Sequence, residues 1–413
     1  MQRSSRPLCA GLLAIAAALF LVGCAQPASI VLWTDIAEMA PVVERFNATN
    51  AGPVIELVYR TDIGRQLRLA PEPPDLVVST YIEDRRTAEL FRPLDRLMRA
   101  DIDLTAFYAP LVAAGSRDGR HYLLPVSFNL PLVYFAGRIP PYGEPIIITP
   151  DEMQAHGERF NETTAGRLTR ISYSPLWNDL FLYELARIHG MLVRENDDGT
   201  PRLPFAAVVA GVTAAQRWID EWNGGLESAV SFADRYLYEP SVELVRQGRI
   251  AYGYTDSADF FRLSDARRTG LRFRWLGSET GVHALEDVVY VGIPRTAANH
   301  QGAEAFLTWF YSDDTQRAII AGAHRDRGDS FGLAGGFPAL WRVTERFMPT
   351  VYPELVGRIP AADRLLFSPS SPRHWGELTD QVVRPWLARE IRGTPQGRDL
   401  DGSIRAWLLQ QEQ

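Results

Sequence analysis

Short runs of β-branched and other apolar residues alternate along the chain with longer stretches in which apolar residues recur at helical spacing. SIVLWTD (29–35), VIELVYR (54–60) and PPDLVVST (73–80) predict strands, and EMAPVVERFNATN (38–50) predicts a helix after the first of them. Strands that alternate with helices are typical of βαβ units, in which helices cover both faces of a mostly parallel sheet. The beginning of the chain therefore predicts an α/β lobe.

The middle of the chain predicts longer helices and a second group of strands. NDLFLYELARIHG (178–190) and FAAVVAGVTAAQRWIDEW (205–222) have apolar residues at helical intervals, and glycine closes or follows each. IAYGYTD (250–256) and EDVVYVGIP (286–294) predict strands, and GAEAFLTWFYSDDTQRAIIAGA (302–323) predicts a further helix. The remainder is mostly helical between prolines and tryptophans, and the sequence contains no internal repeat.

The N-terminal residues have the pattern of a secretory signal peptide. Arg3 and Arg6 precede an uncharged apolar segment that is short for a membrane span. This segment stops at LVGC, which resembles the lipobox of bacterial lipoproteins, where cleavage before the cysteine is followed by its acylation. The resemblance implies a signal peptide at 1–23 and a lipidated Cys24 that begins a short tether, 24–28. An uncleaved anchor helix is the alternative.

Composition excludes several classes of chemistry. Of the two cysteines, Cys9 would leave with the signal peptide and Cys24 would be acylated, so we expect no disulfide and no thiolate site. All 43 basic residues are arginine, which excludes a Walker loop, a pyridoxal Schiff base and a Ser-Lys nucleophile pair. The seven histidines are scattered without an HExxH pair, and we expect neither a metal site nor a cofactor. The net charge of −7 argues against nucleic acid as a partner.

The order of these elements resembles the family 1 extracellular solute-binding proteins of ABC importers, the group that contains the maltose-binding protein. The resemblance covers nearly the whole chain after the signal peptide. Its motifs, in the order of the family, are IVLWTD before VVERFNA, PPDLVVST, LFRPLDRLM, RDGRHYLLPVSFNLPLVYF (117–135) and VVYVGIPRTAANHQGAEAFLTWFYSDDTQ. Each motif alone is weak, and five in the right order are specific.

Three segments depart from the family pattern. The pair at 134–135 reads Tyr-Phe where the family has Tyr-Asn, and TPDE at 149–152 lacks the usual tryptophan. Ala258 stands near the position of a stacking aromatic in many sugar binders, so Phe260 or Tyr254 would have to replace that ring. These departures concern the ligand more than the fold.

The resemblance implies an α/β fold like that of type II periplasmic binding proteins, with two lobes of mostly parallel sheets, a multi-strand hinge and a ligand cleft between the lobes. The first lobe would comprise 29–126 and about 284–328, and the second 127–283 and about 331–413. The segment 125–131 would be the first hinge strand. Open α/β sheets bind ligands beyond the carboxyl ends of their strands, and domain interfaces provide concave surfaces. Closure would bury the ligand and present the closed state to the transporter.

Candidate ligand-binding residues stand where the predicted strands end at the cleft or where aromatic residues adjoin polar ones. Aromatic rings suit the C–H face of a sugar, and carboxylates and amides suit its hydroxyls. The candidates are Trp33, Thr34, Asp35, Ser79, Thr80 and Tyr81 in the first lobe, and Trp177, Asn178, Asp179, Tyr254, Asp256 and Trp375 in the second.

Each candidate has an ordinary structural alternative. For the aromatic residues it is packing in the core, and for Asp179 and Asp256 it is the capping of a helix. Arg60 and Arg138 would suit an anionic ligand, with surface ion pairing as the alternative. Three tryptophans that lie within helical patterns are interpreted as core: Trp218, Trp222 and Trp309.

These observations predict a lipid-anchored substrate-binding protein of an ABC import system, facing the periplasm or the cell exterior. We expect a monomer without enzymatic activity whose partners are a small solute, the ABC permease and the membrane, through Cys24. The favoured solute is a sugar or oligosaccharide, and a polyamine, an organic anion or a metal complex is the alternative in the same fold. An exported glycan hydrolase with a carboxylate pair is the rival class.

Overall fold

The computed structural model describes residues 29–49, 51–84, 86–137, 145–196, 198–325, 330–369, 371–393 and 399–411. Cys24 and Arg138 lie outside the described residues, so the predicted lipid anchor and the second candidate arginine are not part of the description that follows. Among the helices of the described residues, none is long and apolar enough to cross a membrane.

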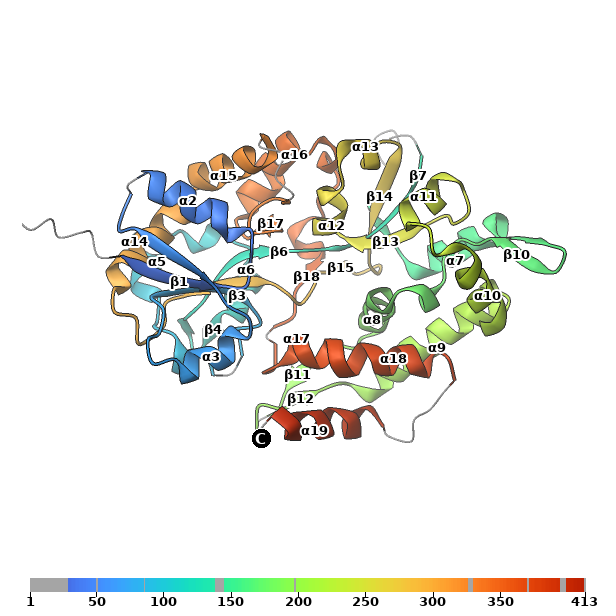
Figure 1. The fold of residues 1–413 in the computed structure, drawn as a ribbon, viewed down its shortest axis with the longest axis horizontal. Coiled ribbons are helices and arrows are strands. Elements are labelled where there is room, and N and C mark those ends of the chain that lie inside the picture. Colours follow the sequence, from blue (N-terminus) through green and yellow to red (C-terminus); the bar gives the residue numbers. More distant parts are fainter. Residues whose placement is uncertain are drawn as a thin grey trace, which may run out of the picture.

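A six-stranded sheet with strand order β17-β6-β16-β3-β1-β2 forms the centre of the first lobe (Figure 1). Its strands are β1 (Ile30–Thr34), β2 (Ile55–Tyr59), β3 (Leu76–Thr80), β6 (Leu124–Phe128), β16 (Val289–Gly292) and β17 (Phe337–Pro338). β1 runs parallel to β2 and β3, whereas β16 runs antiparallel to β3 and β6. The strands are apolar and largely buried, as expected for a sheet with helices on its faces.

The helices of the first lobe lie on both sides of this sheet, with α2 and α15 above it and α3 below it in Figure 1. Phe46 of α2 packs edge-on against Phe306 of α14, with ring centroids 5.2 Å apart. The helices of this lobe are α2 (Met39–Thr49), α3 (Ile63–Leu69), α4 (Thr87–Leu90), α5 (Asp95–Ala100), α6 (Ala109–Ala114), α14 (His300–Phe310) and α15 (Asp313–Arg325).

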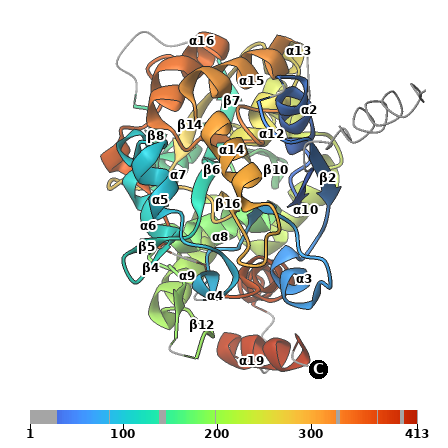
Figure 2. The same ribbon diagram turned by 90° about the vertical axis from the view of Figure 1, so that its left-hand side faces the viewer.

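A four-stranded sheet with strand order β13-β7-β14-β8 belongs to the second lobe. Its strands are β7 (Pro131–Ala136), β8 (Ile147–Ile148), β13 (Gly253–Asp256) and β14 (Leu271–Leu276). The helices around it are α7 (Pro150–Phe160), α8 (Asp179–Ile188), α9 (Phe205–Trp222), α10 (Leu226–Tyr236), α11 (Ser241–Arg246), α12 (Ser257–Arg262), α13 (Asp265–Arg268), α17 (Trp375–Leu378) and α18 (Arg384–Glu390). Both views place α19 (Leu400–Gln411) at the outer edge of this lobe (Figure 1, Figure 2).

The chain crosses between the two sheets along several segments. β6 leads directly into β7 through residues 129–130, within the predicted hinge segment 125–131. The return passes through β15 (Val282–His283), which pairs in parallel with β18 (Leu365–Leu366). The predicted fold of two α/β lobes joined by several strands is therefore confirmed.

Two details differ from the sequence-based expectation. The sheets are mixed rather than mostly parallel, because β16 returns antiparallel into the first sheet and β7 is antiparallel to both of its main neighbours. In addition, Phe337 of β17 pairs with Phe128 of β6, so the chain is still part of the first sheet beyond residue 331, where we expected the second lobe to resume. Between β17 and β18 lies α16 (Met348–Val351), and the final crossing to the second lobe comes at β18.

Candidate functional site

The ends of β1 and β3 meet the start of β16 at one edge of the first sheet, because β16 runs antiparallel to β3 with Val289 opposite Thr80. Asp35 directly follows β1, Tyr81 directly follows β3, and Asp287 lies two residues before β16. β13 of the second lobe also ends beside this edge, across the lobe boundary. We call the following residues the strand-end cluster: Asp35, Ser79, Thr80, Tyr81, Asp256 and Asp287.

Asp35 has one carboxylate oxygen that accepts hydrogen bonds from side chains and one that is buried without a hydrogen-bond partner in the described part of the chain. The hydroxyl of Ser79 donates to Asp35 Oδ2 at 2.8 Å, and the hydroxyl of Thr80 lies 3.5 Å from the same oxygen. Oδ1 is buried and has no hydrogen-bond partner among the described residues. Burial raises the pKa of Asp35. This side chain therefore presents an unused acceptor for a ligand hydroxyl or ammonium group.

Asp256 ends β13 and also caps α12. Its carboxylate accepts a hydrogen bond from the backbone N–H of Asp259 at 2.8 Å, so the capping alternative applies to this residue. The adjacent Ser257 donates to Asn129 Oδ1 at 2.6 Å, which holds the start of α12 against the hinge. Because the carboxylate of Asp256 remains in the cluster, capping and ligand contact are compatible.

The pKa of Asp287 is raised to about 6, chiefly by burial and next by the negative charge of Asp256. The two carboxylates, one from each side of the lobe boundary, are therefore close enough to repel each other. Oδ1 of Asp287, like that of Asp35, is buried without a hydrogen-bond partner. Arg262 and Arg187 oppose the negative charge of Asp256 and Asp287 only in part, because the pKa of each carboxyl is still raised.

A buried ion-pair network lies beside Asp287 and connects α8 to the return crossing. Arg187, which is 1% exposed, donates to Glu184 at 2.9 Å and to the carbonyl of Ala284 at 2.9 Å, and its Nε lies 3.7 Å from Glu286. Glu286 also accepts hydrogen bonds from the hydroxyl of Tyr183 and from other side chains. The charge of Arg187 is thus shared between two glutamates of this network.

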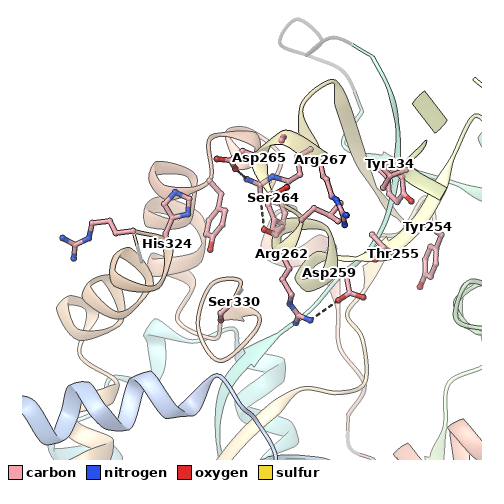
Figure 3. Close-up of a pocket in the computed structure, with 17 residues that line it drawn as sticks. Tyr134, Tyr254, Thr255, Asp259, Arg262, Ser264, Asp265, Arg267, His324 and Ser330 are labelled. Atoms are coloured by element: carbon pink, nitrogen blue, oxygen red, sulfur yellow. Dashed lines mark hydrogen bonds and ion pairs between the residues drawn. The ribbon is translucent and has the colours of Figure 1, made fainter. Parts of the chain in front are cut away.

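A groove of about 1200 Å³ opens between the lobes next to Tyr254 (Figure 3). One wall is formed by α15, where His324 faces the groove, and by Tyr352. The other wall is formed by β7, β13, α12 and α13. The groove offers tyrosine rings, hydroxyls and charged groups, which is the combination that a polar ligand with apolar C–H faces requires.

Arg262, which lines this groove, forms an ion pair across the lobes. Its guanidinium lies 3.4 Å from the carboxylate of Asp259, as the dashed line in Figure 3 shows, and 3.7 Å from that of Glu38 in the first lobe. On the same wall, Arg268 of α13 is likewise paired, with Asp265 and Glu354. These two arginines are therefore already neutralised by protein carboxylates.

Trp33 and Thr34 do not join the cluster. Trp33 lies on the face of β1 that α3 covers, where it lines a second groove and where the guanidinium of Arg60 lies 5.3 Å from its ring centroid. Thr34 is fully buried, and its hydroxyl accepts a hydrogen bond from the backbone of Ile36.

Trp177, Asn178 and Asp179 have structural contacts within the second lobe. Trp177 stacks on Phe232 with ring centroids 5.6 Å apart. Asn178 caps α8 by accepting hydrogen bonds from two backbone N–H groups. Asp179, predicted as a possible cap, is instead the exposed first residue of that helix, 4.0 Å from Arg384.

Trp375 is fully buried, and its indole N–H donates to Glu286 at 2.7 Å. In this conformation its ring packs in the core, which is the alternative that the sequence left open. Tyr81 approaches the next residue, Gly376, so closely that a Cβ there would lie 2.6 Å from the ring. The first-lobe strand end and α17 are therefore in direct contact.

Sequence reasoning missed Asp287, Glu286 and Arg262. The two acidic residues directly precede the apolar run of β16, and that run was recognised as a strand. Only its antiparallel direction, which a single sequence does not reveal, places its beginning beside the ends of β1 and β3. Arg262 had no local signal, because its cross-lobe partner is Glu38.

The comparisons with known proteins identify the fold. No protein-family profile matches the chain, and no curated protein matches its sequence. Among solved structures, CpMnBP1 with mannotriose bound is 16% identical with a TM-score of 0.61, and the match covers 92% of this chain and 98% of that one. The ABC substrate-binding protein Lmo0181 from Listeria monocytogenes, in complex with cycloalternan, is 12% identical with a TM-score of 0.62, covering 92% and 96%.

The sugar-binding protein MalE from Xanthomonas citri is also 12% identical with a TM-score of 0.62, and the match covers 94% of this chain and 100% of that one. The similarity therefore extends over both lobes and over nearly the full length of each of these proteins. The chain has the two-lobed α/β fold of these sugar-binding and substrate-binding proteins.

Proposed function

We propose that this protein is the solute-binding component of an ABC importer and that it binds a carbohydrate between its two lobes. The observation that carries the proposal is the position of the strand-end cluster. Its member Asp256 directly follows Tyr254 and Thr255, which line an interlobe groove, in a fold shared with CpMnBP1 with mannotriose bound and Lmo0181 in complex with cycloalternan. Asp35, Thr80 and Tyr81 would contact the solute from the first lobe, and Tyr254 and Asp256 from the second.

The unused carboxylate oxygens explain why a hydroxylated solute would favour closure. A buried acceptor without a partner costs about 1–3 kcal/mol. Oδ1 of Asp35 and Oδ1 of Asp287 are both buried acceptors without a partner among the described residues. Sugar hydroxyls that donate to them would remove that cost, and the ring of Tyr254 would cover a C–H face. Because the residues come from both lobes, the solute would bind the closed form better than the open form, as a shift toward closure requires.

The charge of the cluster favours one alternative solute class, an amine-bearing molecule such as a polyamine or an amino sugar. Oδ1 of Asp35 and Oδ1 of Asp287 are buried without a hydrogen-bond partner in the described part of the chain, and burial together with the charge of Asp256 raises the pKa of Asp287. An ammonium group would donate to these carboxylates and compensate their charge. An organic anion would meet like charge at the same place, which disfavours it.

The transport context completes the proposal. The lipobox at Cys24 would hold the exported protein beside its permease through acyl chains, because two or more chains anchor a protein stably whereas one does not. Replacement of Cys24 by serine is expected to release the protein from the membrane fraction. Membrane association that persists in this variant, with Cys9→Ser as the control, would contradict the anchor.

A thermal-shift screen tests the solute directly. Neutral mono- and oligosaccharides, amino sugars, polyamines and organic anions are each added to the purified protein, and a ligand at 100 times its Kd should stabilise it by about 2.7 kcal/mol. Stabilisation by neutral sugars supports the carbohydrate proposal, and stabilisation by amines alone supports the alternative. Stabilisation by organic anions alone would contradict both, and hydrolysis of a glycan would support the rival enzyme class.

A further inference from the structure

Three potential metal ligands from the two lobes meet where α3 lies beside the beginning of α17 (Figure 1). Asp62 directly precedes α3 in the first lobe, whereas His374 and Glu377 belong to the start of α17 in the second. One ligand atom from each of the three residues lies within 4.8 Å of the others. None of these residues belongs to the strand-end cluster.

The imidazole of His374 makes no hydrogen bond with the described residues. Its Nε2 is buried without a partner, and its Nδ1 lies 3.7 Å from Glu377 Oε2, which is beyond hydrogen-bond length. The side chain is only 11% exposed, and its ring packs edge-on against Trp407. The ring is therefore held in place by packing, and neither of its nitrogens is used in a hydrogen bond to the described part of the chain.

Positive charges lie near His374. Arg373 is the preceding residue, and Arg65 and Arg68 act on the ring from the first lobe, where Asp62 opposes them with negative charge. A dication would therefore bind less tightly here than in a fully compensated structural site.

We propose that Asp62, His374 and Glu377 bind a divalent transition-metal ion, Zn²⁺ in preference to Ca²⁺ or Mg²⁺, that links the two lobes. One imidazole and two carboxylates are ligands that Zn²⁺ takes with bonds of about 2.0–2.2 Å, whereas Ca²⁺ and Mg²⁺ require six or more oxygen ligands. Bonds of that length bring ligand atoms closer together than 4.8 Å. Since Asp62 belongs to the other lobe, metal binding would draw α3 toward α17 and favour the closed form.

Titration calorimetry on untagged, chelator-treated full-length protein tests the site. ZnCl₂ is titrated without any solute, so the result does not depend on the identity of the transported molecule. We expect one Zn²⁺ per protein and a loss of affinity of at least about tenfold in His374→Ala and in Asp62→Asn. His300→Ala and Glu158→Gln, which change a histidine and an exposed carboxylate elsewhere, should bind Zn²⁺ as the wild type does.

Small-angle scattering separates a link between lobes from binding within one lobe. Zn²⁺ should decrease the radius of gyration of the wild type but not that of Asp62→Asn, in which both remaining ligands lie in the second lobe. Asp62 is only partly buried, so this variant is expected to fold even if His374→Ala does not. Equal Zn²⁺ affinity in the wild type and Asp62→Asn, or an equal decrease in their radii, would overturn the proposal.

Discussion

At the scale of single residues, the buried carboxyl of Asp287 makes the stability of the fold depend on pH. Its pKa rises from an ordinary 3.8 to about 6, mainly through burial. In the window between these values the folded chain holds a proton that the unfolded chain has released. Stability from this group is therefore greatest at acidic pH and is lost as the pH rises through about 6.

The variant Asp287→Asn should remove this dependence. Asparagine keeps the shape of the side chain and carries no charge, so the free energy of unfolding should rise by up to about 3 kcal/mol at pH 8 but by only about 1 kcal/mol at pH 4.5. Urea unfolding at the two pH values, with Glu158→Gln as a control, measures the effect. The same increase at both pH values would show that the charge of Asp287 is not its cause.

The hydrogen bond between Trp375 and Glu286 can be isolated because a second tryptophan provides a matched control. Trp375 and Trp218 are both fully buried, but Nε1 of Trp218 has no partner. Replacement of either ring by phenylalanine removes a similar volume. We expect Trp375→Phe to lower the free energy of unfolding by about 1–3 kcal/mol more than Trp218→Phe. Equal losses in denaturant unfolding would argue against this hydrogen bond.

At the scale of elements, the contact between α8 and α9 positions the ion-pair network beside the cluster. Gly211 of α9 packs on Ala186 of α8 so closely that a Cβ would lie 2.6 Å from the Cα of Ala186. Since α8 also carries Glu184 and Arg187, a shift of this helix would move the network. The glycine is therefore a requirement of helix packing.

A substitution of Gly211 by alanine tests that requirement. The added methyl group should force the helices apart and cost about 1–3 kcal/mol, although alanine normally favours a helix. Gly64→Ala in α3 is the matched control, because a Cβ there meets nothing within 4 Å, and it should stabilise the protein by about 0.5–1 kcal/mol. Thermal unfolding that moves in the same direction for both variants would contradict this account of the packing.

The sequence predicts elements better than it predicts their partners. Periodicity locates α8 and α9 to within a few residues, because both have apolar residues at helical spacing. α9 buries one face, whereas α8 is buried on all sides, including Glu184 and Arg187. The segment 302–323 was predicted to be one helix, yet it is divided into α14 and α15 at Ser312. Trp375 is ambiguous from sequence because its partner, Glu286, lies 89 positions away. Such a contact leaves no local signal.

At the scale of the whole molecule, the two lobes and their crossing strands could be predicted, because the order of motifs along the chain carries that information. The direction of the strands could not be predicted, and it determines which polar residues lie at the same edge of a sheet. Asp35, Ser79 and Thr80 were found because they end parallel strands, whereas Asp287 was missed because it begins an antiparallel one. The buried, unpaired oxygens that distinguish the site exist only in the folded molecule.

Closure of the lobes over a solute is the central claim, and small-angle scattering of metal-free protein tests it most directly. A saturating carbohydrate from the screen should decrease the radius of gyration of the wild type. Asp35→Ala, which lacks an acceptor, should need at least about tenfold more sugar for the same decrease. Sugar binding that leaves the radius unchanged, or that proceeds equally well without the carboxylate of Asp35, would contradict the account.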